Sequence, residues 1–286
     1  MTAHLFSVDV EEYFQVNAFE RIVPRTEWGT YPTRVAASVD AILEMLARRN
    51  ATGTFFTLGW IARHHPRVVR AIADAGHEVA SHGYWHRRIP TLSPDEFRED
   101  VRTSKAELED VSGQLITGFR APSFSIIPGH EWALDVLAEE GYRYDSSRFP
   151  IRRPDYGSPD VPTVPHVVHT PSGELLEIPL ATTRLLGTPL PAAGGGYLRQ
   201  FPFALIRRAF REASAARVPA MFYIHPWEID PDQPRLPVSR LTRVRHYRGL
   251  GRTLPLMDRL LSEFPFTSVR AAFPHVGAGA AAGQGA

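Results

Sequence analysis

Strand-like and helix-like segments alternate along most of this chain, and this alternation restricts the possible folds more than any other feature. Apolar runs typical of strands occupy residues 4–8, 53–57, 77–81, 118–120, 143–145, 175–178, 221–224 and 266–269. Helical periodicity is present at residues 33–49, 66–75, 93–112, 129–140, 202–216 and 254–264. Such alternation predicts parallel βα units. With 286 residues, 43% of them hydrophobic, the chain is long enough for one domain of the α/β barrel type.

Polar residues that are unusual in a buried strand follow several of the predicted strands. They are Asp9 with Glu11, His82, Arg120, Asp145 and His225. In an α/β barrel, the residues just past the carboxyl ends of the strands converge on one mouth. We therefore expect these side chains, which are far apart in the sequence, to share one pocket.

Two histidines, His82 and His86, stand four residues apart directly after a predicted strand. If this segment forms one helical turn, both imidazole rings point the same way, and imidazole is a preferred ligand of zinc and related divalent metals. Histidine pairs are also common on protein surfaces, so a metal site requires a third ligand.

The first predicted strand ends in three acidic residues that can supply that ligand. Side chains alternate between the two faces of a strand, so Asp9 and Glu11 project to one side and Glu12 to the other. Two carboxylates on one face of a buried strand end require a cationic partner. We expect Glu12 to begin a solvated loop, whereas Asp9, between Val8 and Val10, should be buried with a partner.

The composition excludes several classes of site and partner. The chain has no Cys, so a metal must be held by His and carboxylate groups, and disulfides are excluded. The formal net charge is +1, which argues against a nucleic acid partner. The basic residues are 31 Arg and the single Lys105, a skew that we attribute to genomic base composition.

No signal peptide is recognisable at the N-terminus, and no apolar stretch approaches the ~20 residues of a membrane span. We therefore expect a cytoplasmic protein without a membrane span, and no pattern indicates an oligomeric state.

Three segments depart from the alternation. Residues 149–171 contain six Pro and predict a long surface loop, residues 277–286 predict a flexible Gly/Ala tail, and the triglycine 194–196 predicts either a linker or a close backbone approach.

Four motifs in this order resemble those of polysaccharide deacetylases of the carbohydrate esterase type. They are Asp9-x-Glu11, His82-x-x-x-His86, Arg120-Ala121-Pro122 and Tyr223-Ile224-His225. The fit spans about residues 4–230, and the segments 145–150 and 225–228 further resemble the subgroup found beside exopolysaccharide and exosortase loci. The resemblance implies a deformed (β/α) barrel of about seven strands in residues 1–276, with a family-specific part from about residue 226.

The resemblance also implies a divalent metal, with zinc the first choice, on Glu11, His82 and His86. The usual first motif of the family has two adjacent Asp residues, a general base followed by a metal ligand. In this chain Val10 occupies the second position, so Glu11, one residue further on the same strand face, becomes the candidate ligand. The sequence leaves both Glu11 and Glu12 as candidates for the third ligand.

The catalytic roles implied by the resemblance fall on four residues. Asp9 is the general base and His225 the general acid, Arg120 orients Asp9, and Asp145 braces this polar cluster. The alternatives are a structural ion pair for Arg120 and a hydrogen-bonded core histidine for His225. The backbone N–H of Ser123, which follows Pro122 where the family usually has an aromatic residue, would help form an oxyanion hole. Candidate pocket-lining residues are Phe124, Tyr197 and Trp227.

The expected activity is removal of an N-acetyl group from an amino sugar in a polysaccharide, oligosaccharide or precursor. Two alternatives remain: a metal-independent hydrolase of cyclic amides such as allantoin, from the same superfamily, and an inactive carbohydrate-binding protein. The intact His82–His86 pair with Glu11 counts against the first alternative. The presence of both Asp9 and His225 counts against the second.

Overall fold

The computed structural model describes residues 2–153, 156–185 and 187–277. Its central sheet contains parallel strands in the spatial order β10-β1-β2-β3-β4-β5-β7. These strands are β1 (His4–Val10), β2 (Thr54–Thr57), β3 (Glu78–Ser81), β4 (Gly118–Phe119), β5 (Tyr144–Asp145), β7 (Gly173–Glu177) and β10 (Met221–Ile224). The predicted α/β class with parallel strands is confirmed.

The sheet curves round on itself, because the chain just past β7 reaches the strand at the opposite edge. Leu180 forms a parallel bridge with Met221 of β10, and the Ala181 N–H donates to the Met221 carbonyl at 3.0 Å. Within the described residues the result is a deformed barrel of seven parallel strands, as predicted. Two further strands extend it: β6 (His166–Thr170) pairs antiparallel with β7, and β11 (Phe266–Thr267) pairs with β1.

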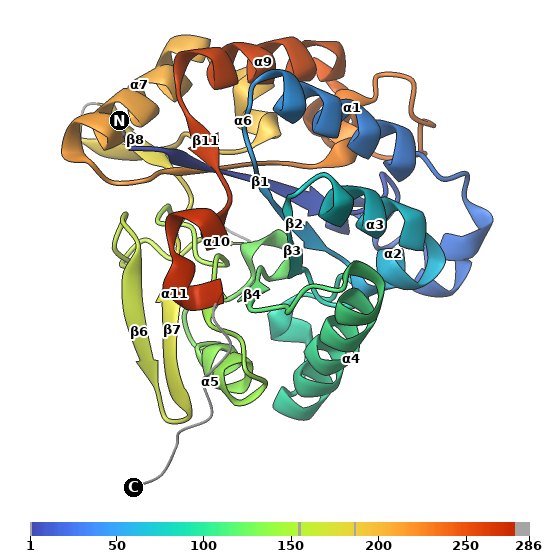
Figure 1. Cartoon of the computed structure of the whole chain (residues 1–286). Helices are drawn as coiled ribbons and strands as arrows, with labels where there is room; N and C mark the ends of the chain where they lie inside the picture. The colour runs from blue at the N-terminus through green and yellow to red at the C-terminus, as the bar shows by residue number, and fades with distance from the viewer. Residues whose placement is uncertain (1, 154–155, 186, 278–286) are drawn as a thin grey trace, which may run out of the picture.

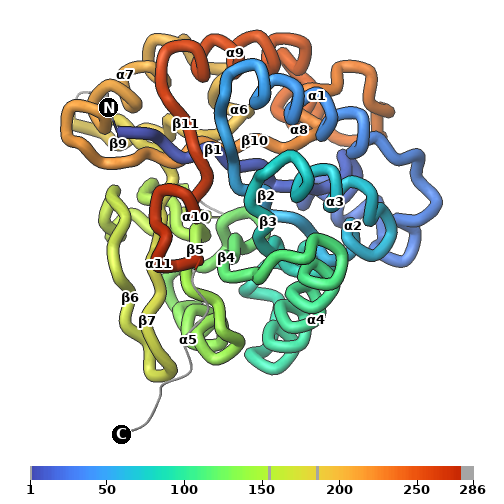
Figure 2. The backbone as a smooth tube through the Cα atoms, viewed as in Figure 1, coloured from blue at the N-terminus to red at the C-terminus, as the bar shows by residue number. Residues whose placement is uncertain are grey.

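Helices surround this sheet, as Figures 1 and 2 show. The longer ones are α1 (Val35–Arg48), α3 (Pro66–Asp74), α4 (Pro94–Ser112), α5 (Trp132–Glu139), α7 (Phe203–Ala216), α8 (Arg240–Tyr247) and α9 (Thr253–Glu263). The shorter ones are α2 (Gly59–His64), α6 (Gly195–Gln200), α10 (Val269–Ala272) and α11 (Pro274–Gly277). The start of α4 is fixed by a capping box in which Ser93 and Glu96 each accept a backbone N–H of the other.

Strand β1 lies at the centre of the fold, and all seven of its residues are buried. Its outward face packs on helices, as shown by His4, whose ring is 5.0 Å from that of Phe210 in α7. Its inward face carries Ser7 and Asp9 into the barrel, where both contact Arg120. Because side chains alternate between the two faces, a strand whose outward face packs on helices can also carry polar groups into the interior of the barrel.

The Pro-rich segment 149–171 differs from the predicted surface loop. Phe149 is fully buried, and residues 166–170 form strand β6, because β7 offers a free edge that pairs with this extended chain. A second short hairpin, β8 (Thr182–Leu185) with β9 (Thr188–Pro191), was also not predicted. The predicted Gly/Ala tail lies outside the described residues, except that Gly277 ends α11.

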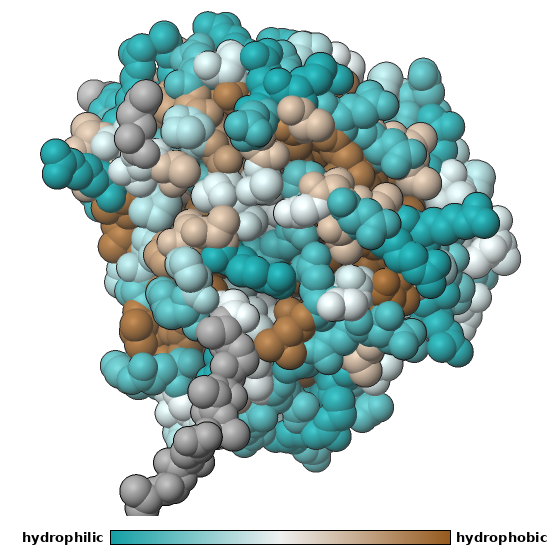
Figure 3. Space-filling model, in the orientation of Figure 1, coloured by the Kyte–Doolittle hydropathy of each residue, from teal (hydrophilic) through white to brown (hydrophobic). Residues whose placement is uncertain are grey.

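Hydrophilic and hydrophobic residues are interspersed on the face of the molecule shown in Figure 3. In the part of the chain that the structure describes, no helix is both long and apolar enough to cross a membrane.

Two buried histidines of the barrel should make the free energy of unfolding depend on pH. His4 and His77 each accept a backbone N–H at Nδ1, and burial lowers the pKa of each from 6.5 to about 4. Between these values the unfolded chain binds more protons than the folded chain. The stabilisation is therefore complete above about pH 6.5 and is lost as the pH falls towards about 4.

Urea unfolding between pH 7.5 and 4.5 checks this expectation. His77→Leu should flatten the acid limb, by up to roughly 3 kcal/mol over the range, since one pKa unit corresponds to about 1.4 kcal/mol. The exposed His169 provides the control, and His169→Asn should leave the slope unchanged. An acid limb that is equally steep in His77→Leu would contradict a neutral buried His77.

Candidate metal centre and active site

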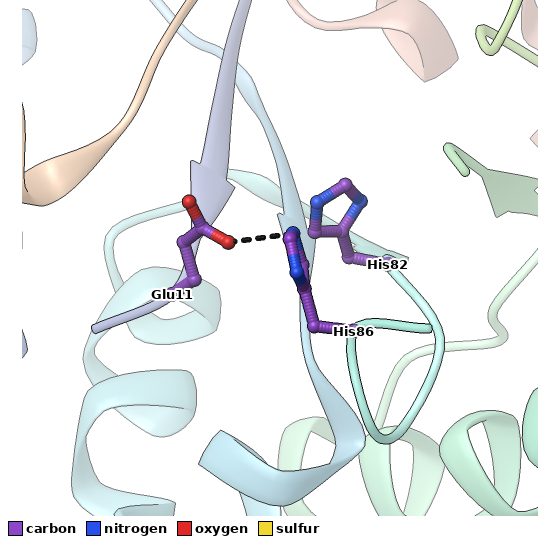
Figure 4. Close-up of side chains that lie close together, drawn as sticks. All are labelled: Glu11, His82 and His86. Atoms are coloured by element: carbon purple, nitrogen blue, oxygen red, sulfur yellow. Dashed lines mark ion pairs between the residues drawn. The ribbon is translucent and has the colours of Figure 1, made fainter. Parts of the chain in front are cut away.

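Glu11, His82 and His86 converge at the mouth of the barrel, as Figure 4 shows. Their candidate ligand atoms all lie within 4.8 Å of one another, and all three side chains are buried. Glu11 follows β1, whereas both histidines lie on the loop after β3. The predicted convergence of these residues is thus found in the structure.

The two histidines do not stand on a helical turn, so that part of the prediction is wrong. Residues 82–86 form an irregular loop in which Gly83 and His86 adopt left-handed conformations, with φ of 74° and 50°. Asp100 of α4 holds this loop by accepting the N–H groups of Tyr84 at 2.7 Å and Trp85 at 3.2 Å. A Cβ at position 83 would lie 2.7 Å from the Asp100 carboxylate, which explains the glycine.

The ring of His82 is oriented for binding a cation. Its Nδ1 donates to the backbone carbonyl of Arg120 at 2.8 Å, which leaves Nε2 without a proton. Burial lowers the pKa of His82 to about 4, so the imidazole is neutral near pH 7. A neutral imidazole fixed by a backbone acceptor is the form that ligates metals.

Glu11 supplies an unsatisfied buried oxygen at the same point. Its Oε1 accepts the indole N–H of Trp227 at 3.1 Å, whereas Oε2 lies 2.8 Å from His86 Nε2 without a properly oriented hydrogen bond. Burial raises the pKa of Glu11, but the neighbouring imidazoles, His86 above all, outweigh this and lower it to about 2. Ligand atoms that share a tetrahedral zinc ion are roughly 3.4 Å apart. The three side chains therefore fit a divalent cation.

Glu12 has a different role, and this answers the question of which acid faces the site. Its carboxylate accepts the backbone N–H groups of Arg34 and Val35 and the hydroxyl of Thr33, at the N-terminus of α1. It therefore satisfies free N–H groups of the helix. The prediction that Glu12 begins a solvated loop is wrong. The alternation of strand faces places Glu11 in the site.

Asp9 and Arg120 form a buried ion pair next to this group. Arg120 Nη1 donates to Asp9 Oδ1 at 2.6 Å and to Ser7 Oγ at 2.9 Å. Its other nitrogens donate to the carbonyl and hydroxyl oxygens of Ser146, and the guanidinium lies 4.0 Å from the ring centre of Phe56. Arg120 is thereby fully engaged, and Asp9 Oδ2 remains available towards His225.

His225 lies opposite these carboxylates, with its side chain 20% exposed. Its Nε2 is 3.9 Å from Asp9 Oδ2 and 3.6 Å from Glu11 Oε1, and its Nδ1 is 3.1 Å from Glu228 Oε2. Burial lowers the pKa of His225, but the hydrogen bond to Glu228 and the nearby carboxylates outweigh this and raise it to about 9. Glu228, three residues after His225, was not among the site residues predicted from the sequence.

Asp145 does not join this cluster directly, and its predicted role requires correction. Its carboxylate accepts the hydroxyl and the N–H of Ser147, and the Ser147 hydroxyl accepts the N–H of Ala121 at 2.7 Å. The adjacent residue Ser146, not Asp145, holds Arg120. Burial raises the pKa of Asp145, which lies beside the buried Glu177.

The candidate pocket residues fall into two groups. Trp227 reaches the site, since it donates to Glu11 and stacks on His225 with 5.0 Å between the rings. Ser123 and Phe124 both have positive φ values, 55° and 52°, so this turn is constrained, and Phe124 packs against Tyr223. Tyr197 packs against Phe149, and its hydroxyl is hydrogen-bonded to that of Tyr156.

Two models of known protein families match successive segments of this chain. A model described as polysaccharide deacetylase matches residues 28–144, and a model described as a domain of unknown function (DUF3473) matches residues 146–274. Residues 28–144 are therefore similar to polysaccharide deacetylases. Strands β7 and β10 of the second segment pair with β5 and β1, so both segments contribute to one sheet.

The curated relatives share only part of their length with this chain. A peptidoglycan-N-acetylglucosamine deacetylase of Bacillus cereus is 30% identical over 117 residues, which are 37% of this chain and 42% of that protein. A chitooligosaccharide deacetylase of Bradyrhizobium is 27% identical over 97 residues, 34% of this chain and 42% of that protein. The chain thus spans less than half of the length of these two relatives.

Solved structures support the fold over almost the whole chain. A putative polysaccharide deacetylase from Mycobacterium smegmatis superposes with a TM-score of 0.62 at 19% identity, covering 96% of this chain and 91% of that one. A CE4 family pseudoenzyme from Bacillus anthracis gives 0.50 at 16% identity, covering 95% and 65%. Since one of these neighbours is a pseudoenzyme, the function must be argued from the site.

Metal binding should depend on the three converging side chains and not on Glu12. His82→Ala, His86→Ala and Glu11→Gln should each remove most of the bound metal, because each deletes one of three ligands. Glu12→Gln is the matched control and should bind metal as the unmodified protein does. Elemental analysis after zinc loading, with thermal unfolding to verify the fold, measures this. Full metal content in Glu11→Gln would disprove the assignment.

Proposed function

We propose that this protein is a metal-dependent hydrolase that removes N-acetyl groups from an amino sugar. The observation that carries the proposal is the meeting of two sets of residues at one barrel mouth. One set, Glu11, His82 and His86, fits a divalent cation, and the other is Asp9 facing His225. Amide hydrolysis requires activation of a water molecule and protonation of the leaving nitrogen, and these sets provide for both.

The metal is proposed to be zinc, because two imidazoles and one carboxylate are a common ligand set for catalytic zinc. When bound, the ion supplies Lewis acidity and a lowered water pKa. Trp227 supports the site because its indole N–H donates to Glu11 Oε1 and so fixes the orientation of this carboxylate.

Asp9 is the proposed general base. Its Oδ1 is held by Arg120, so Oδ2 takes the proton from water as the water oxygen attacks the acetamide carbonyl carbon. The guanidinium of Arg120 supplies the positive charge that a buried carboxylate requires as a partner. The backbone N–H of Ser123, in a turn with positive φ, is the proposed donor to the negative charge that develops on the carbonyl oxygen.

His225 is the proposed general acid. As the C–N bond breaks, Nε2 donates a proton to the leaving amine, and acetate and the free amino sugar result. The hydrogen bond to Glu228 and the nearby carboxylates raise the pKa of His225, which keeps the proton available near neutral pH. Asp9 and His225 are close enough, at 3.9 Å, to act on one small group between them.

The substrate class is proposed from the named relatives and from two aromatic side chains. The relatives are named for peptidoglycan and for chitooligosaccharide, both of which contain N-acetylated sugars. Trp227 stacks on His225 and Tyr197 is only partly buried, so these two aromatic side chains are the proposed contacts for a sugar ring. The motifs shared with the exopolysaccharide-associated subgroup favour an exopolysaccharide or its precursor as the substrate.

An assay with two candidate substrates tests the proposed function against its two alternatives. The zinc-loaded protein should release acetate from an N-acetylated chitooligosaccharide and should leave allantoin intact. Hydrolysis of allantoin by metal-free protein would favour the cyclic amide alternative. Binding of the oligosaccharide without release of acetate, in fully metal-loaded protein, would favour an inactive binding protein.

Replacement of Asp9 separates the base from the metal ligands. Asp9→Asn keeps the shape of the side chain and the contact with Arg120, but it cannot take a proton. The rate of acetate release should fall by on the order of 10² to 10⁴, the range for acid–base groups, while metal content stays unchanged. Steady-state kinetics with parallel metal analysis measures both, and an active Asp9→Asn protein would refute this mechanism.

A further inference from the structure

A single carboxylate oxygen holds the imidazole of His225 on the side away from Asp9 and Glu11. Glu228 Oε2 accepts the backbone N–H of His225 at 3.1 Å and lies 3.1 Å from its Nδ1. The arrangement arises because residues 226–229 form one turn of 3-10 helix, which brings position 228 back over position 225. The ring is thus fixed at one nitrogen, and Nε2 points towards Asp9 and Glu11.

Glu228 is itself fixed by a buried arginine. Its Oε1 pairs with Nη1 of Arg199 in α6, and both side chains are at most 2% exposed. The remaining guanidinium nitrogens donate to the carbonyl oxygens of Arg248 at 2.9 Å and His246 at 3.0 Å. Arg199 is therefore held by backbone groups, and the carboxylate has little freedom to turn away from His225.

The triglycine segment allows this packing. A Cβ placed at Gly195 would lie 2.4 Å from Glu228 Oε2, whereas one at Gly196 would lie 3.8 Å from Glu228 Oε1. Position 195 must therefore be a glycine for α6 to approach the carboxylate, and position 196 has room for a methyl group. This contact corresponds to the close backbone approach that the triglycine predicted.

We propose that Glu228, held by Arg199 and by the close approach of Gly195, is the positioning residue for the general acid His225. Its carboxylate accepts the Nδ1 proton of the imidazolium, so that the second ring proton, on Nε2, faces the leaving nitrogen of the substrate. A carboxylate that orients an imidazole in this way is a general device of acid–base sites. The proposal rests on the proposed function and assigns to Glu228 a role that Asp145, which does not contact His225, cannot fill.

Two substrates with different leaving groups test the role of Glu228 through His225. Hydrolysis of an N-acetyl amino sugar requires a proton on the leaving amine, whereas 4-nitrophenyl acetate releases a stable phenolate without one. Glu228→Gln should therefore lower kcat on the amide by on the order of 10²-fold, with KM nearly unchanged. The rate on the ester should change by less than about threefold in the same protein, since proton donation contributes little there.

The two neighbouring glycines provide a matched pair of variants that leave Glu228 itself unchanged. Gly195→Ala should reproduce the selective loss on the amide, because the added methyl group displaces Glu228. Gly196→Ala, in the same helix, should behave as the unmodified protein. This pair keeps the test decisive even if Glu228→Gln does not fold, because neither alanine removes a buried charge.

Nitrogen NMR of histidine-labelled, zinc-loaded protein gives a readout that does not depend on activity. The Nδ1–H signal of His225, assigned by its loss in His225→Ala, should change in Glu228→Gln and Gly195→Ala and persist in Gly196→Ala. Equal losses on amide and ester, or an unchanged signal in both test variants, would overturn the positioning role. If the unmodified protein cleaves neither substrate, the proposed function fails, but the NMR signal still decides how His225 is held.

Discussion

The buried guanidinium of Arg120 is the group on which the rest of the barrel mouth depends. Its side chain binds Ser7 and Asp9 at the inner face of β1 and Ser146 just after β5, and its backbone carbonyl receives the Nδ1 proton of His82 after β3. One residue thus fixes the ends of three strands. A charge buried this deeply is tolerated because every nitrogen has an oxygen or an aromatic face beside it.

The parts of the site that could be predicted are those encoded by local pattern. The alternation of strand faces places Asp9 and Glu11 together, and polar residues after apolar runs mark His82, Arg120 and His225 as members of one mouth. The irregular loop of His82 and His86 was not predictable from spacing, because its shape depends on Asp100 of α4, which comes from a different part of the chain. Glu228 was missed for a related reason: its partner Arg199 is 29 residues away in sequence.

The strand assignments failed where pairing, and not composition, decides the structure. Residues 166–170 follow a Pro-rich stretch, and only the free edge of β7 makes them a strand. The division of the site between the two family segments has a similar origin. Asp9 and Glu11 precede the first matched segment, and His225 lies within the second, so neither match by itself contains the proposed base, metal ligands and acid.

The adjacent residues Glu11 and Glu12 point in opposite directions, one into the mouth of the barrel and the other to the first turn of α1. The single peptide unit between them therefore links the mouth of the barrel to the beginning of α1, beside the ion pair of Arg34 with Asp230. Any event that tightens Glu11 also restrains the amides of residues 34 and 35, so that slow hydrogen exchange at the beginning of α1 becomes a remote gauge of how firmly the site is held.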